Sequence, residues 1–504
     1  MTRSIPMALV AATYGVPTAP AHPDLALADV FAASRERLQA RGDAFRRDPI
    51  TPARTHQFEQ DVQAALREMG RPFVEFAYNH VEPADGEESS RHAQYEHESY
   101  TRVRRATPQN AWTVFGPIRV RRFGYRPSQA GEPMLFPAAV RLGLVSGASP
   151  ARACRACELL AEAGATQHRV RARRRADYGV GWGVKKLRQV SRAIADDRAT
   201  FRHDAQVEQL LAWVAAADAS TGRHKPVLCA GRDGITLRLR VTKGSLYEVA
   251  STGTISVYDR RGRRLGTAYL AYTPEPGQPT MTGALTDAIR DVLTQWEGGL
   301  PRLCYVTDAG DNETGYYEAV LRGMIHPRTG QVVAWVRVID YYHASGRVWL
   351  LAGVLFADAG RAARWAHTML RWLLTPGGVN RVLHSAAAVR AIRTLTRTQT
   401  KEYRTAYDYL RSRMSHMDYA RYRRVGVPLG SGVTEAACKT VFTQRLKLSG
   451  MRWGKDGAQA ILNLRVILLS GVWDVVYQRV LAAWTLPVMG GHADSHQKTL
   501  EIAA

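Results

Sequence analysis

The spacing of hydrophobic and polar positions changes several times along the chain, and each change marks a different kind of segment. Apolar side chains recur at helical spacing over residues 58–69, and this pattern ends near Pro72. Apolar and other residues then alternate on both sides of Gly116, which predicts a β-hairpin. We therefore expect a mainly helical N-terminal region over residues 1–110, followed by a hairpin.

The next segment, residues 137–197, has the pattern of several short helices separated by glycine-containing turns, and it is rich in Arg and Lys. Short helices with this charge are typical of a helix-turn-helix DNA reader, so residues 111–222 are predicted to bind DNA. A solvated helical bundle is the alternative. The residues expected to contact DNA in this region are Arg171, Arg173, Arg174, Arg175, Lys185 and Lys186.

From residue 226 onward the pattern is that of strands. VLCAGRDGITLRLRV, SLYEVASTGTISVYD and GTAYLAYT indicate three strands, and a helix with an apolar face follows. RLCYVTD and QVVAWVRVID indicate two further strands, with a helix between them. Three strands, helix, strand, helix, strand is the element order of an RNase H-like sheet, by analogy of fold. We therefore predict an α/β fold with an RNase H-like mixed-sheet core that begins at residues 223–347.

Residues 348–424 are continuously helix-like and basic, with a break at residues 375–378. Because a further candidate acidic residue, Glu435, lies beyond them, they are interpreted as an all-α insertion into the core. Residues 425–478 would complete the core, and residues 479–504 would form a C-terminal tail.

The net charge of the chain indicates what kind of partner it binds. The chain has 504 residues, with 69 Lys and Arg against 45 Asp and Glu, a formal net charge of +24. So large an imbalance favours a polyanionic partner such as double-stranded DNA. The five cysteines are odd in number and irregularly spaced, which favours a reducing cytosol, and Cys154 and Cys157 are interpreted as small thiols on a helix. The most apolar stretch, ILNLRVILLSGVW, is too short to span a bilayer, so no membrane association is expected.

Three carboxylates carry the candidate chemistry: Asp233 and Asp308 in or after predicted strands, and Glu435 on a predicted helix. Carboxylates on separate elements can converge on two divalent ions that hold the attacking and leaving oxygens of a phosphodiester exchange. Hard oxygen ligands suit Mg²⁺, and Mn²⁺ is expected to substitute for it. All three residues are therefore candidate metal ligands and catalytic residues.

Each carboxylate also has a structural interpretation. Asp233-Gly234 is a strong signal for a hairpin turn. Asp308 or Asp311 could cap the helix that follows. Glu435 lies near a helix N-terminus, where the helix dipole favours an acid. What favours the functional interpretation is their joint placement in one predicted core within a basic chain.

Two further groups lie beside these carboxylates in sequence. Asp340 and His343 form Asp-Tyr-Tyr-His after the last predicted strand; they could join the site or be a helix cap with a packed histidine. Lys439 lies one turn beyond Glu435 and could hold a substrate phosphate or form an ordinary ion pair with it. The cations expected to contact DNA here are Lys439, Arg445, Lys447 and Arg452.

The strings VTDAGDNE, RVIDYYHA and GSGVTEAACKTVFTQRLKLSGMRWG resemble those of bacterial insertion-sequence transposases of the ISKra type, which are DDE enzymes similar to the Mutator group. The resemblance covers roughly residues 73–477. It implies that Asp233, Asp308 and Glu435 are the catalytic triad and that Asp340 and His343 are site neighbours. It also implies an N-terminal part that recognises terminal inverted repeats. The chain lacks the paired-cysteine cluster expected near the N-terminal hairpin of relatives.

The resulting hypothesis is a DNA transposase that cuts element ends by Mg²⁺-dependent hydrolysis and joins the 3′-OH to target DNA. The family implies a homodimer or larger assembly on DNA, in the bacterial cytoplasm at the nucleoid. Two alternatives stay open: an RNase H-like nuclease without integration, and a non-catalytic, sequence-specific DNA-binding regulator derived from a transposase.

Overall fold

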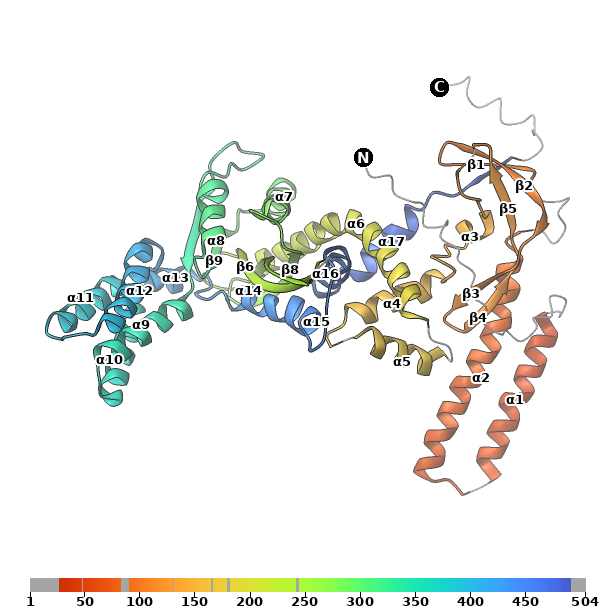
Figure 1. The fold of residues 1–504 in the computed structure, drawn as a ribbon, viewed down its shortest axis with the longest axis horizontal. Helices are drawn as coiled ribbons and strands as arrows, with labels where there is room; N and C mark the ends of the chain where they lie inside the picture. Colours follow the sequence, from red (N-terminus) through yellow and green to blue (C-terminus); the bar gives the residue numbers. More distant parts are fainter. Residues whose placement is uncertain are drawn as a thin grey trace. The chain divides into compact units, whose positions relative to one another are not determined.

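In a computed structural model of the protein, residues 27–47, 49–82, 90–129, 131–164, 166–178, 182–241 and 244–490 are described (Figure 1). The chain forms two compact units. Unit 1 consists of Met1–Leu160, Ala165–Asp197 and Tyr477–Ala504, and unit 2 consists of Ala161–Gly164 and Arg198–Val476.

Unit 1 begins with two long helices, α1 (Leu27–Arg47) and α2 (Pro52–Asn79). Helix α2 continues through Pro72, so the prediction that it ends there is wrong. A proline inside a helix removes one hydrogen bond and costs about 3 kcal/mol. Val74 and Tyr78 offset this cost, because both lie beyond the proline and pack against the buried core of the neighbouring hairpin.

That hairpin, β3 (Gln109–Thr113) with β4 (Gly116–Val120), confirms the alternating pattern around Gly116. The N-terminal region is not helical throughout, however, because it also contains two strands. Arg-rich β2 has few apolar residues to reveal its alternation, although its Tyr100 is buried. The sheet has the order β11-β1-β2-β5. Its strands are β1 (His92–Tyr95), β2 (Glu98–Ala106), β5 (Phe123–Pro127) and β11 (Val488–Gly490).

Helices occupy the rest of unit 1. The predicted C-terminal tail contributes β11, which pairs antiparallel with β1. Cys154 and Cys157 lie on α4, as expected for small buried thiols on a helix, although only Cys157 is buried and Cys154 is half-buried. The last helix, α6, has 36 residues and is much longer than the short helices predicted. The helices are α3 (Pro137–Arg141), α4 (Pro150–Ala161), α5 (Gln167–Tyr178) and α6 (Val184–Ala219), and α6 extends into unit 2.

Unit 2 is built on a five-stranded mixed sheet of order β10-β9-β6-β7-β8. Strands β10, β9 and β6 are parallel, and β7 and β8 continue the sheet antiparallel. Along the chain the order is three strands, helix, strand, helix, strand, as the hydrophobic pattern predicts, and the fold class is mixed α/β. The strands are β6 (Val227–Arg240), β7 (Ser245–Tyr258), β8 (Arg264–Tyr272), β9 (Arg302–Thr307) and β10 (Trp335–Ile339).

Each face of this sheet has its own core. On one face, apolar residues of α6 and α7 (Pro279–Gln295) pack against Leu228, Ala230 and Tyr305. This face also receives α8 (Asp311–Tyr316) and the π-helix η2 (Tyr317–Leu321). On the other face, Cys229, Val306 and Val338 pack against helices that follow β10. The sheet is therefore the middle layer of three.

The chain after β10 is helical for about 85 residues, and Figure 1 shows these helices gathered at one end of unit 2. The first of them begins directly after β10, at Tyr341 rather than at the predicted residue 348. The predicted break near residues 375–378 separates α10 from α11. The helices are α9 (Tyr341–Leu355), α10 (Ala359–Leu373), α11 (Gly378–Ala391), α12 (Arg397–Arg413), η3 (Met414–His416) and α13 (Tyr419–Val425).

The chain then returns to the sheet. Among the described residues no single helix is long and apolar enough to cross a bilayer, although α16 and α17, bent by 117°, pass that test as a pair. The returning elements are α14 (Gly432–Ala437), the π-helix η4 (Cys438–Thr443), α15 (Gln444–Leu446), α16 (Lys455–Leu469) and α17 (Trp473–Ala482).

Candidate functional site

Three aspartates lie at equivalent positions on the three parallel strands. Ala230 of β6 pairs with Tyr305 of β9, and counting on three residues from each leads to Asp233 and Asp308. Thr307 of β9 pairs with Ile339 of β10, and the next residues are Asp308 and Asp340. Neighbouring strands lie about 4.8 Å apart. Asp308 and Asp340 therefore follow the carboxyl ends of β9 and β10, and Asp233 lies level with them inside β6. The three acids are adjacent at one edge of the parallel part of the sheet.

Asp233 lies inside β6, where it pairs with Thr252, and the strand continues for seven more residues. The hairpin-turn interpretation of Asp233-Gly234 is therefore wrong. The carboxylate accepts a hydrogen bond from the Gly234 backbone N–H at 2.7 Å and one from the Cys438 thiol at 3.3 Å. Burial raises the pKa of Asp233, and the negative charges of Asp308 and Glu435 raise it further.

Asp308 follows β9 directly. Its carboxylate accepts a hydrogen bond from the Gly310 N–H at 3.1 Å, and its carbonyl accepts one from the Tyr409 hydroxyl of α12 at 2.8 Å. The N-cap of α8 is Gly310, without a side-chain hydrogen bond, so neither Asp308 nor Asp311 caps that helix. Backbone contacts therefore hold Asp308, and its carboxylate is left half-exposed at the sheet edge.

Glu435 is brought to this edge by the close approach of α14 to the sheet. A Cβ added at Gly231 would lie 2.0 Å from the Thr434 hydroxyl, so only glycine permits this contact. The hydroxyl of Thr434 also lies 2.7 Å from that of Thr254 on β7. Among the described residues Glu435 forms no ion pair with Lys439, and the helix changes to π geometry at Cys438. Single π turns of this kind occur frequently at functional sites.

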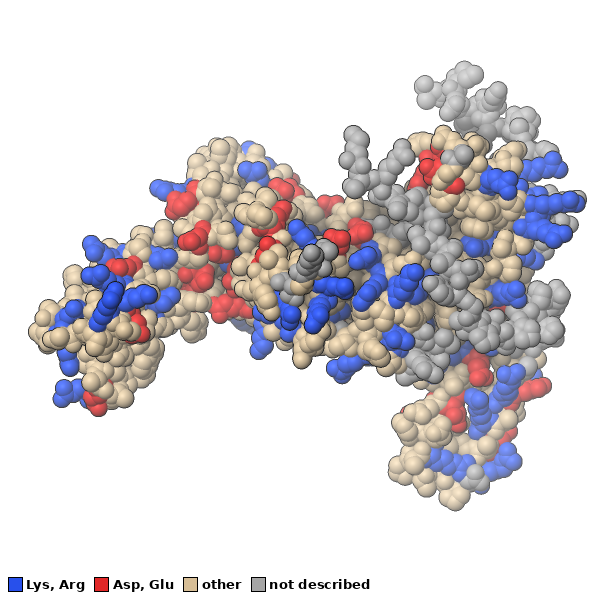
Figure 2. Space-filling view, viewed as in Figure 1, with Lys and Arg blue, Asp and Glu red and all other residues tan. Residues whose placement is uncertain are grey.

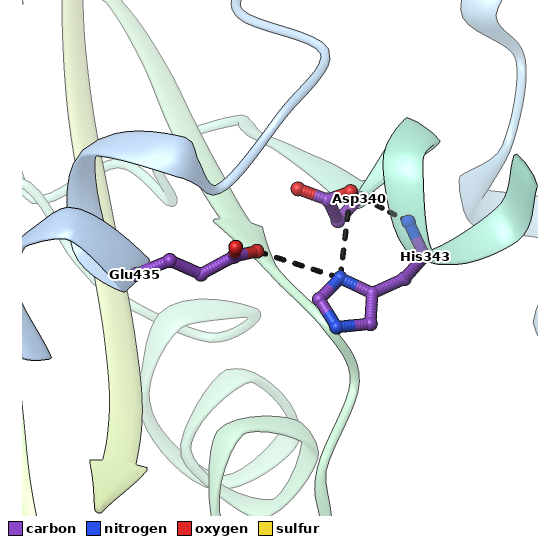
Figure 3. Close-up of side chains that lie close together, drawn as sticks. All are labelled: Asp340, His343 and Glu435. Carbon is purple, nitrogen blue, oxygen red and sulfur yellow. Dashed lines mark hydrogen bonds and ion pairs between the residues drawn. The ribbon is translucent and has the colours of Figure 1, made fainter. Parts of the chain in front are cut away.

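The most closely packed polar group consists of Asp340, His343 and Glu435, whose candidate ligand atoms lie within 4.8 Å of one another (Figure 3). His343 Nδ1 lies 3.5 Å from Asp340 Oδ1 and 3.5 Å from Glu435 Oε1. Ser431 links the two acids, since its hydroxyl lies 2.7 Å from Asp340 Oδ2 and 2.6 Å from Glu435 Oε1. Figure 3 shows the imidazole between the carboxylates, with Nε2 directed away from both.

These contacts set the charges of the cluster. Burial opposes ionisation of Asp340, but hydrogen bonds from His343 and Ser431 outweigh it and lower the pKa of Asp340 to about 2. The hydrogen bond to Asp340 raises the pKa of His343, and the charges of Asp340 and Glu435 add to this effect. Asp340 also caps α9 by accepting from the His343 N–H at 2.9 Å. The helix-cap interpretation of Asp340 is therefore confirmed, and the same motif places His343 beside Glu435.

The predicted triad is brought together only in part. Asp233, Asp308 and Glu435 lie near enough for the last two to raise the pKa of the first. Within the described residues, however, the only group whose ligand atoms meet within 4.8 Å is Asp340, His343 and Glu435. Glu435 therefore lies closest to Asp340 and His343, and Asp233 and Asp308 lie nearby.

Glu313 and Ser431 are site residues that the sequence analysis missed. Glu313, in the first turn of α8, is buried. Burial is the main cause that raises the pKa of Glu313, and the negative charges of Asp308 and Asp233 raise it further. An acid two residues after Asp311 gave no sign that it would face inward. The signal for Ser431 was the Gly-Ser-Gly that precedes Glu435.

The predicted DNA-contacting cations divide into several groups. Arg445 is fully buried beside the Trp453 ring, and burial lowers its pKa to about 10, so its assignment to DNA is wrong. Arg171 and Lys186 are half-buried; the Arg171 Nε donates to the Trp182 carbonyl at 3.0 Å, and burial lowers the pKa of Lys186. The side chains of Arg174 and Arg175 lie outside the described residues. The exposed cations are Arg173, Lys185, Lys439, Lys447 and Arg452.

Apart from His343, the acids of the sheet edge have no basic partner among the described residues. In the described parts of the chain, none of Asp233, Asp308 and Glu435 forms an ion pair with Lys or Arg. Figure 2 shows acidic side chains gathered over the part of unit 2 that contains α8, β9 and α14. Converging carboxylates repel one another unless a cation or a proton intervenes. This donor set therefore fits divalent ions: oxygen ligands suit Mg²⁺ and Mn²⁺, and His343 adds a nitrogen ligand.

Comparison with known proteins does not identify the chain. No protein-family model matches it, and no curated protein matches it.

Proposed function

We propose that the protein is a DNA transposase that cleaves and joins DNA strands at the acidic edge of its mixed sheet. The observation that carries this proposal is the alignment of Asp233, Asp308 and Asp340 across three parallel strands, beside Glu435 and, among the described residues, without a Lys or Arg partner. The element order and the strand order support an RNase H-like core. The net charge of +24 supports a polyanionic substrate.

In this proposal Asp233, Asp308 and Glu435 hold Mg²⁺ or Mn²⁺, with Asp340 and His343 as neighbours. Bound ions of this kind lower the pKa of an attacking oxygen and neutralise charge that develops on phosphorus. Asp340 and Ser431 orient Glu435 and His343. Because His343 Nδ1 faces the carboxylates, its Nε2 is the atom that can donate to a phosphate or hold a proton.

The rest of the proposal concerns DNA and assembly. Unit 1 would recognise terminal inverted repeats, and two copies would hold the two element ends together on nucleoid DNA in the cytoplasm. The exposed cations Lys439, Lys447 and Arg452 follow Glu435 in sequence and would contact phosphates next to the site.

The test uses the full-length protein and duplexes made from the DNA that flanks its gene. Mg²⁺-dependent cleavage at one position, and joining of pre-cut 3′ ends to a target plasmid, are the expected results. Cleavage without joining would instead assign a nuclease. Binding of the flanking duplex without any cleavage in Mg²⁺ or Mn²⁺ would assign a DNA-binding regulator.

Metal affinity is expected to fall with acidity. Because the pKa of Asp233 is raised, a proton competes with the ion over a pH range in which an ordinary aspartate is already ionised. Calorimetric titration with Mn²⁺ should therefore show tighter binding at pH 7 than at pH 5, with proton release at the lower pH. Asp233→Asn is the control, and it should bind more weakly but with less proton release. Equal proton release by this variant would contradict the assignment of Asp233.

Arg445 and Lys447 should separate stability from DNA binding, although they are two residues apart. Arg445→Met removes a buried guanidinium, so it should change the melting temperature and leave the salt dependence of DNA binding unchanged. Lys447→Met removes an exposed cation and should lower the slope of log affinity against log salt by about one. Thermal melts and fluorescence anisotropy over a salt series measure the two effects. A lower slope for Arg445→Met would contradict the burial of that side chain in the working protein.

A further inference from the structure

Strands β6 and β7 extend beyond the sheet to which they belong. Strand β6 pairs with β9 only over Val227–Ala230, and β7 pairs with β8 only over Ser251–Tyr258. Residues 235–240 and 245–250 therefore pair with each other and with no other strand of the sheet among the described residues. We call this two-stranded projection the β6–β7 ribbon. A ribbon of two strands is marginally stable unless something packs against it.

One face of the ribbon is supported. Leu237, Leu239 and Ala250 are buried on this face. Leu239 forms a β-bridge with Trp453, and the Arg240 N–H donates to the Trp453 carbonyl at 2.7 Å. The Trp453 indole in turn donates to the Leu446 carbonyl at 3.1 Å. The ribbon is therefore held at its far end by the segment that follows α15, next to the exposed Arg452.

The opposite face is exposed and has a distinct composition. Strand alternation places Thr236, Arg238 and Arg240 of β6 on this face, opposite Val249 and Tyr247 of β7. The Tyr247 side chain is 63% exposed, and the Arg238 guanidinium lies 5.7 Å from its ring centroid. The acid of this stretch, Glu248, lies across from Leu237 and so belongs to the other face. The exposed face therefore offers two cations, an aromatic ring and small apolar groups, with no acid among its described residues.

We propose that the exposed face of the β6–β7 ribbon is a duplex-DNA contact surface that enters a groove, on the face of β6 opposite to the acidic site. This inference rests on the proposed function and names a second surface that holds the DNA partner. A two-stranded ribbon fits the major groove of B-DNA, and several DNA-binding proteins use one there. Arg238 and Arg240 supply contacts to phosphates or base edges, and Tyr247 and Val249 supply apolar contacts.

The ribbon face and the acids lie on opposite faces of β6. Asp233 and Arg238 belong to the same strand, five residues apart, and an odd separation along a strand places two side chains on opposite faces. Asp233 faces the segment that carries Cys438, whereas Arg238 and Arg240 face the other way. At about 3.3 Å per residue the two positions are about 17 Å apart along the strand. The ribbon would therefore bind a stretch of duplex other than the one whose scissile phosphate lies at Asp233.

The alternative partner for an apolar and aromatic face is a second copy of the chain. The charges argue against it, because two copies meeting through this face would bring Arg238 and Arg240 against their own counterparts. The mass of the DNA-free protein distinguishes the two occupants.

The test measures duplex affinity by anisotropy over a salt series in Ca²⁺, which keeps binding separate from cleavage. The double variant Arg238→Ala with Arg240→Ala should lower the salt slope by about two. Thr236→Lys adds a cation to the same face and should raise the slope by about one. Arg264→Ala is the matched control, because Arg264 is an exposed arginine at the opposite end of the same sheet, and it should change neither slope nor affinity.

The outcomes separate this proposal from the proposed function. The ribbon proposal alone is overturned if wild-type protein cleaves the duplex but the salt slope of DNA binding is unchanged in both the double variant and Thr236→Lys. Wild-type protein that binds no duplex overturns both. The Tyr247→Ala variant tests the second copy. If it changes the mass of the DNA-free protein and leaves the salt slope unchanged, the ribbon face binds a second copy of the chain and the proposal is overturned. The gain expected from Thr236→Lys remains measurable if the double variant does not fold.

Discussion

Asp308→Asn is expected to reduce the rate of DNA cleavage by about a thousand-fold. The substitution keeps the shape of the side chain but removes one of the charges that would hold a divalent ion. A loss of about 4 kcal/mol in stabilisation of the transition state corresponds to this factor. Asp308 lies at the centre of the acidic edge, between Asp233 on one strand and Asp340 on the other. The variant is expected to fold, because an amide oxygen can still accept from the Gly310 N–H and the Tyr409 hydroxyl donates to the backbone carbonyl.

Single-turnover cleavage with Mg²⁺ measures this effect, and anisotropy in Ca²⁺ checks that DNA affinity is retained. Asp311→Asn is the matched control, because Asp311 is an exposed acid three residues further on, in the first turn of α8. Cleavage at the normal rate by Asp308→Asn would refute the site. An equal loss in Asp311→Asn would show that the effect is not specific to the sheet edge.

Asp340→Ala is expected to lower the free energy of unfolding by about 2–5 kcal/mol, because it leaves buried donors without an acceptor. The Asp340 side chain is fully buried and accepts from the Ser431 backbone N–H, the Ser431 hydroxyl and the His343 N–H. Asp358→Ala is the matched control. Asp358 also caps a helix, through the Arg361 N–H, but it is exposed, so its loss should cost only about 1 kcal/mol.

The same variant has a characteristic pH dependence. The pKa of Asp340 is lowered from 3.8 to about 2 in the folded protein, so its stabilising effect is complete above the ordinary value and is lost as the pH falls towards 2. The stability gap between wild type and Asp340→Ala, measured by urea denaturation in EDTA, should therefore narrow between pH 4 and pH 2. A gap that stays constant over this range would contradict the proposed hydrogen bonding of the carboxylate.

Local sequence was informative about the core because each of its three parallel strands has an aspartate near the end of its apolar run. VLCAGRD, LCYVTD and WVRVID each place an aspartate at or just beyond the end of an apolar run, and in parallel strands such ends share one edge. The mixed α/β class and the order of the elements follow from the same runs. The length of β6 did not, since Asp233-Gly234 reads locally as a turn, and only its pairing with β7 shows that the strand continues.

Charge alone was a poor guide to burial. Arg445 has the same local character as Lys447, yet it packs beside Trp453 inside unit 2 whereas Lys447 is exposed. Pro72 likewise looks like a helix end until the packing of Val74 and Tyr78 is taken into account. In each case side-chain packing that the local pattern does not reveal outweighs a local preference worth only a few kcal/mol.

The amino-acid sequence by itself determined the strands of the core, the acids at their ends and the basic character of the chain, because alternation, helical spacing and charge are properties of neighbouring residues. Only the tertiary structure decided which acids meet. Glu435 reaches the edge because Thr434 fits against Gly231, 203 residues earlier, and it then joins Asp340 and His343 more closely than Asp233 and Asp308. The approach of two distant backbones depends on side-chain volumes at a single contact, and no periodicity along the chain records it.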